Sequence, residues 1–176
     1  KQTFFGNKAA TLSDTNPATW GNAIDFPNRS GNTSYAIVSS SDSLNLQNPL
    51  TIESWVKISS PSSGLPIKSF SVLSFGDYAL LYRLGLDEQG PDGRVRLVFN
   101  ASTNDGSGIM ARSNTTIPAE EWTHVAAASF SDTQGCHVQL FINGVLSGSG
   151  EHLVADCQLQ AKYEPGKKFL MAKPTG

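Results

Sequence analysis

The amino-acid sequence predicts an all-β protein whose strands form an antiparallel sandwich of two sheets. The first observation is a series of short runs in which apolar and polar residues alternate, each bounded by glycine, asparagine, aspartate or proline. A period of two residues is typical of a strand with one face on a core. The second observation is that no stretch of useful length has helical periodicity and no segment repeats. About ten or more short strands joined by tight turns favour a sandwich.

The clearest strand is Leu50–Ile58, with the sequence LTIESWVKI. Its mainly apolar parity is expected to face the core. The opposite parity carries Thr51, Glu53, Trp55 and Lys57. We therefore expect these four side chains on the outer face of a sheet.

Similar runs are found along the rest of the chain, and the residues from Lys1 to Thr19 are expected to form a loop or a short edge strand. The remaining expected strands are Trp20–Phe26, Ser34–Val38, Phe70–Phe75, Tyr78–Leu86, Arg94–Asn100, Ile109–Ser113, Trp122–Phe130, Cys136–Ile142, Val145–Ser149 and Lys168–Ala172. In the strand from Arg94, we expect Val95, Leu97 and Phe99 to point inward. Asn143-Gly144 is a strong signal for a two-residue hairpin turn.

Length and composition limit the classes of protein that fit. The 176 residues are enough for one domain, residues 1–176, with a substantial core. The formal charge is −2 and there is no basic run, which disfavours nucleic acid and anionic membranes as partners. No apolar run approaches the length that spans a membrane, so we expect no membrane insertion.

The two cysteines predict a disulfide. Cys136 opens the strand that leads to the Asn143-Gly144 turn, and Cys157 lies in the segment that returns from it. A hairpin brings such positions together, and secretion would oxidise them. We therefore predict a Cys136–Cys157 bond.

Four Asn-x-Ser/Thr sequences are candidate glycosylation sites. Their acceptor residues are Asn28, Asn32, Asn100 and Asn114. They favour a eukaryotic secretory protein, while a bacterial secreted or cell-surface protein remains the alternative. Either alternative places the chain outside the cytoplasm.

Seven motifs in order resemble one family. They are GNAIDF, SYAIV, SDSLNL, LTIESWVK, GRVRLVF, EEWTHVAA and VQLFINGVLSGSG, between Gly21 and Gly150. Together they resemble laminin-G-like domains of the concanavalin-A-like jelly roll. The resemblance implies two stacked curved sheets and a recognition module for glycans or proteins, with calcium at one rim in some members. Glycosidases share the architecture, so the fold alone does not decide the function.

The sequence argues against catalysis. Glycoside hydrolases of this architecture resemble one another in a Glu-x-Asp-x-x-Glu strand, which supplies two carboxylates on one face. Here Glu53 is alone on its strand, and Glu120 and Glu121 are expected to point to opposite faces. The three histidines have no serine or cysteine elbow nearby, and we expect His124 to be a packed structural residue. We expect no enzymatic activity.

The resemblance also implies candidate calcium ligands. Asp77 lies where calcium-binding laminin-G domains carry an aspartate, and Asn104 and Asp105 lie in a loop that resembles their glycine-rich loop. Calcium takes six to eight oxygen ligands of this kind. The alternative is that these residues serve only as turn formers.

Sugar binding would need an aromatic platform with hydrogen-bonding neighbours. Trp55, Glu53 and Lys57 share a strand face and could line a groove on the concave sheet, with Arg83 as a further polar candidate. The alternative is a structural Trp55 covered by a loop such as Ser59 to Lys68. The expected function is glycan binding, and the alternative is a protein-interaction or assembly module of a larger extracellular protein or filament.

The resemblance implies one strand beyond the late strand at Lys168, and no such segment follows Gly176 in this sequence. A missing strand would leave unpaired backbone groups along an edge. We expect another segment to supply it, by self-assembly or as a donor strand. The N-terminal residues from Lys1 to Thr19 are the alternative donor.

Overall fold

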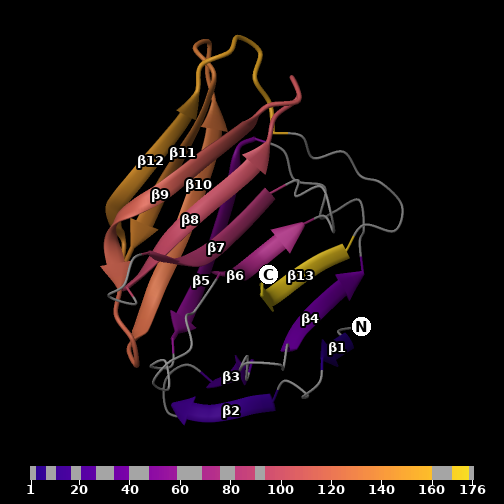
Figure 1. Cartoon of the computed structure of the whole chain (residues 1–176), viewed down its shortest axis with the longest axis vertical. Helices are drawn as coiled ribbons and strands as arrows, with labels where there is room; N and C mark the ends of the chain where they lie inside the picture. The colour runs from indigo at the N-terminus through magenta and orange to yellow at the C-terminus, as the bar shows by residue number, and fades with distance from the viewer. Residues whose placement is uncertain are drawn as a thin grey trace.

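The computed structural model describes residues 3–6, 11–16, 21–26, 34–39, 48–58, 69–75, 82–89, 94–159 and 168–174. These residues form thirteen β-strands, and no helix occurs among them. Consequently, no helix of the described residues could cross a membrane. The strands build an all-β antiparallel jelly-roll sandwich, as the sequence predicts (Figure 1).

Two sheets face each other and a small third sheet lies apart from them (Figure 1). In spatial order the seven-stranded sheet consists of β1 (Thr3–Gly6), β4 (Ser34–Ser39), β13 (Lys168–Pro174), β6 (Ser69–Phe75), β7 (Tyr82–Gln89), β8 (Arg94–Ser102) and β9 (Gly108–Ile117). The four-stranded sheet consists of β12 (Val145–His152), β11 (Cys136–Ile142), β10 (Trp122–Ser131) and β5 (Leu50–Lys57). The two-stranded sheet pairs β2 (Thr11–Asn16) with β3 (Gly21–Asp25).

The core lies between β7, β8 and β9 of the larger sheet and β5, β10 and β11 of the smaller one. Alternation along each strand supplies it, and Val95, Leu97 and Phe99 point inward as expected. Among the described residues, the largest fully buried side chain is Tyr82, whose pKa is raised to about 12 by burial. The phenol therefore stays neutral and contributes to the core as an apolar ring with a polar tip.

The two sheets approach closely where β12 lies against β9. Gly148 and Gly150 of β12 face this contact. A Cβ atom at Gly148 would overlap the carbonyl oxygen of Arg112, and one at Gly150 would overlap that of Met110. The close approach of two backbones explains why glycine occupies both positions.

The structure confirms the predicted hairpin, lengthens one predicted strand and places the N-terminal strand. The hairpin between β11 and β12 is confirmed, because Asn143 and Gly144 have positive φ angles of 50° and 76°, as a type I′ turn requires. β9 continues to Ile117, beyond the predicted end at Ser113. The N-terminal residues contribute β1, which pairs with β4 at one end of the seven-stranded sheet.

We predict that Gly150→Ala destabilises the protein by about 1–3 kcal/mol, since the added methyl group must push β12 away from the β9 backbone. Urea denaturation measures this effect. Ser149→Ala is the matched control, because Ser149 is exposed on the same strand. An unfolding midpoint of Gly150→Ala equal to that of the wild type would contradict the close sheet contact.

Candidate functional site

The outer face of the four-stranded sheet carries a cluster of aromatic and charged side chains. On β5 these are Glu53, Trp55 and Lys57, which alternate with partly or fully buried residues. On β10 they are Trp122 and His124, which share the parity opposite to the buried Thr123 and Val125. We call these five residues the Trp55 face.

The antiparallel register of β5 and β10 brings the five residues together. Trp55 lies directly opposite His124, and Lys57 lies opposite Trp122. The ring centroids of Trp55 and His124 are 5.3 Å apart, with the planes tilted by 56°. The side chains of Trp55 and Trp122 remain 47% and 38% exposed. The loop from Ser59 to Lys68, which the alternative places over Trp55, lies outside the described residues.

Charged groups surround the two indole rings. The Nε2 atom of His124 lies 3.6 Å from Oε2 of Glu53. The Nζ atom of Lys57 lies 4.0 Å from Oε2 of Glu120. The exposed Lys57–Glu120 ion pair contributes little to stability, so it leaves hydrogen-bonding groups beside the rings that a ligand can use.

The backbone around His124 fixes one end of this face. Asn143 Oδ1 accepts a hydrogen bond from the His124 amide at 2.9 Å, and the Asn143 amide donates to the His124 carbonyl at 2.8 Å. The turn between β11 and β12 is thereby attached to β10. Nearby, the Glu120 amide donates to the Ile58 carbonyl at 2.7 Å, which ties the start of β10 to the end of β5. His124 is half-buried, yet it belongs to the exposed face and is not confined to the core.

Arg83, the fourth residue predicted for ligand binding, does not join the Trp55 face. It lies on β7 of the other sheet and is buried, at 6% exposure. Its Nε atom donates to Ser71 Oγ at 3.0 Å, and its Nη2 atom donates to Asp87 Oδ1 at 3.0 Å. The guanidinium group lies where a Cβ atom of Gly85 would be. Its contacts are structural, so the predicted ligand-binding set divides between the two sheets.

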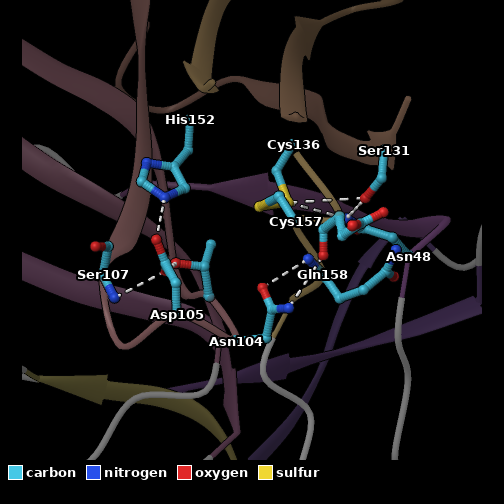
Figure 2. Close-up of polar contacts among 11 residues, drawn as sticks. Asn48, Asn104, Asp105, Ser107, Ser131, Cys136, His152, Cys157 and Gln158 are labelled. Atoms are coloured by element: carbon cyan, nitrogen blue, oxygen red, sulfur yellow. Dashed lines mark hydrogen bonds and ion pairs between the residues drawn. A yellow bond between two sulfur atoms is a disulfide. The ribbon is translucent and has the colours of Figure 1, made fainter. Parts of the chain in front are cut away.

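The rim loop after β8 is the second place where predicted residues gather (Figure 2). Asp105 Oδ1 accepts hydrogen bonds from Thr103 Oγ1 at 2.6 Å and from the Ser107 amide at 3.0 Å. Asp105 Oδ2 lies 2.8 Å from Nε2 of His152, at the end of β12. Both carboxylate oxygens therefore contact protein groups, and the loop is joined to the other sheet.

Asn104 fastens the same loop to the segment around Cys157 (Figure 2). Its Nδ2 atom donates to the Asp156 carbonyl at 3.0 Å, and its Oδ1 atom accepts from the Gln158 amide at 2.9 Å. The predicted Cys136–Cys157 disulfide is confirmed, with Cα atoms 5.5 Å apart. The disulfide and the Asn104 side chain hold this segment at two adjacent points.

Asp77, one of the three predicted calcium ligands, lies outside the described residues. Where the structure describes the chain, no three or more His, Cys, Asp or Glu side chains gather as a metal site would require. The oxygens of Asp105 and Asn104 accept hydrogen bonds from protein groups. Calcium binding through these residues stays a prediction.

The glycosylation sites also stay predictions. Asn28 and Asn32 lie outside the described residues. Asn100 is half-buried on β8, whereas Asn114 is exposed on β9. Exposure makes Asn114 the more accessible acceptor of the two.

The fold defines a class of protein, an all-β jelly-roll sandwich, and its smaller sheet carries the exposed Trp55 face. Comparison with family models agrees, since the laminin G model described as the concanavalin A-like lectin/glucanases superfamily matches residues 30–164. The chain belongs to this superfamily, which supports a carbohydrate- or protein-binding module. Laminin G-like domains are generally non-catalytic, although the superfamily includes glycosidases. No curated protein matches the chain.

The hydrogen bonds at the rim predict how stability depends on pH. Hydrogen bonds from Thr103, and then from His152 and the Ser107 amide, hold the pKa of Asp105 below its usual range. The pKa of Asp132 is lowered by the amide of Gln134, and then by His137. A carboxylate with a lowered folded-state pKa stabilises the protein above its unfolded pKa of about 3.9, and this contribution is lost as the pH falls below that value.

We therefore predict that Asp105→Asn lowers the melting temperature at pH 7 and loses less further stability than the wild type between pH 5 and pH 3. Thermal melts across this range measure both effects. Glu121→Gln serves as the control for removal of an exposed carboxylate. If the melting temperature of the variant falls between pH 5 and pH 3 by as much as that of the wild type, Asp105 does not contribute to acid denaturation.

Calcium, if bound to the native state, is expected to raise the melting temperature, and EDTA should reverse the rise. The measurement is a thermal melt at millimolar calcium, with Asp77→Ala and Asp105→Asn as variants. A rise that both variants abolish would support the predicted ligands. Identical melts with and without calcium in the wild type would leave Asp77, Asn104 and Asp105 as turn-forming residues.

Proposed function

We propose that the protein is a non-catalytic glycan-binding module whose binding site is the Trp55 face. The observation that supports this most directly is the exposed ring of Trp55, at 47%, with the side chains of Glu53, Lys57 and His124 around it. An indole ring offers a flat apolar surface to the C–H groups of a sugar ring. Carboxylate, ammonium and imidazole groups beside it can exchange hydrogen bonds with the hydroxyls.

The same face favours binding over catalysis. Glu53 contacts His124, and Glu120 contacts Lys57, so the two carboxylates are each directed to a different basic group. Glycoside hydrolysis needs two carboxyl groups placed on either side of one bond. We infer that these groups orient a ligand and do not cleave it.

The proposal includes secretion or display at the cell surface. The Cys136–Cys157 disulfide suits an oxidising compartment. Removing it is expected to cost about 3 kcal/mol in the chain-entropy model for a loop of this size.

Protein binding or self-assembly is the second candidate function, and one observation favours it. Val145 and Leu146, at the start of β12, are 68% and 55% exposed. Leu146 pairs with Phe141 across the strands, and Phe141 pairs with Ala126 on β10. Exposed apolar side chains that lie next to one another mark interaction surfaces.

The experiment is a glycan array followed by calorimetry on the glycans that bind. We predict that Trp55→Ala weakens binding at least tenfold, or about 1.4 kcal/mol, because the stacking surface is removed. Met110→Ala is the matched control, since Met110 is a large exposed apolar residue on β9 of the other sheet.

Wild-type affinity in a folded Trp55→Ala variant would contradict the assignment of the site. A wild-type protein that binds no glycan and self-associates in light scattering would favour the second candidate function. Circular dichroism checks that each variant is folded.

A further inference from the structure

We propose that the ligand is an internal stretch of a linear, uncharged polysaccharide, held on Trp55 and Trp122 as successive platforms. This inference rests on the glycan-binding function proposed above and adds the class of glycan. It is supported by the placement of the two tryptophans, by the outer surface next to them and by the local charge.

The two tryptophans lie in neighbouring rows of one face. Trp122 is opposite Lys57 and Trp55 is opposite His124, so the two indoles are diagonal neighbours on β10 and β5. Diagonal positions in an antiparallel pair are about 7–8 Å apart. Each ring is exposed enough to carry a sugar ring of its own. Two platforms at this separation would engage two units of one chain, whereas a single sugar would use only one of them.

The face continues beyond the tryptophans as a surface of small side chains. Ala126 lies opposite Glu53, and Ala128 lies opposite Thr51. Ala126 is 8% exposed and Ala128 is half-buried, so their methyl groups form a recessed strip between β5 and Phe141 of β11. A chain can lie across such a surface and extend past both platforms, so the arrangement suits the interior of a polymer.

The charges around the platforms disfavour an acidic polymer. Glu53 and Glu120 contribute two carboxylates, against the single ammonium group of Lys57. The arginines that the structure describes lie on the other sheet, at Arg83, Arg94, Arg96 and Arg112. A sulfated or carboxylated chain would meet an excess of like charge at the Trp55 face. The matching ligand is therefore an uncharged one.

The test is calorimetry with oligosaccharides of one to six units from the β-gluco, xylo, manno and chito series, with a chondroitin sulfate hexasaccharide as the acidic probe. We expect the affinity of the wild type for at least one neutral series to rise at least tenfold from one unit to four. In Trp122→Ala this rise should be largely lost, while Trp122→Phe should restore it. Met110→Ala, on the other sheet, should behave as the wild type does.

Each other outcome has a defined meaning. Equal affinity for one unit and for six, a length dependence unchanged in a folded Trp122→Ala, or a preference for the sulfated probe would overturn this inference while leaving glycan binding intact. Failure of the wild type to bind any of the sugars, on the array or in calorimetry, would overturn the proposed function as well.

Discussion

The antiparallel pairing of β5 with β10 is the constraint on which both faces of the smaller sheet depend. One register places Ile52 opposite Ala127 toward the core and Trp55 opposite His124 toward the outside. A shift by one residue would exchange the two sets, exposing apolar residues and burying Glu53 and Lys57. Burial of the core parity therefore fixes the composition of the Trp55 face, the proposed binding site.

At the opposite end of β10 and β11, side chains and a covalent bond join the sheets. Asp105 bonds to His152, Asn104 bonds to the Gln158 amide, and the disulfide holds Cys157 to Cys136. These contacts account for the polar residues at this rim. These contacts stabilise one rim of the jelly roll. The Trp55 face lies at the other end of the strands that reach this rim.

Much of the fold could be predicted from the sequence, because alternation along strands such as β5 and β8 reports burial directly. The Asn143-Gly144 turn and the disulfide follow from local chemistry and a hairpin. Parity does not specify which strands pair, so the sequence pointed to Trp55 but not to its neighbours Trp122 and His124, and it grouped Arg83 with a site on the other sheet. Asp105 and His152 are 47 residues apart, and no local pattern signals their contact.

The central claim is that β5 and β10 present one binding face. The most direct measurement is a nitrogen-15 titration that follows the indole N–H signals of Trp20, Trp55 and Trp122 as a bound oligosaccharide is added. The account predicts that the signals of Trp55 and Trp122 move together and saturate at the same ligand concentration. Saturable binding that leaves both signals in place, with shifts at backbone amides around Arg83 and Arg112 instead, would contradict it.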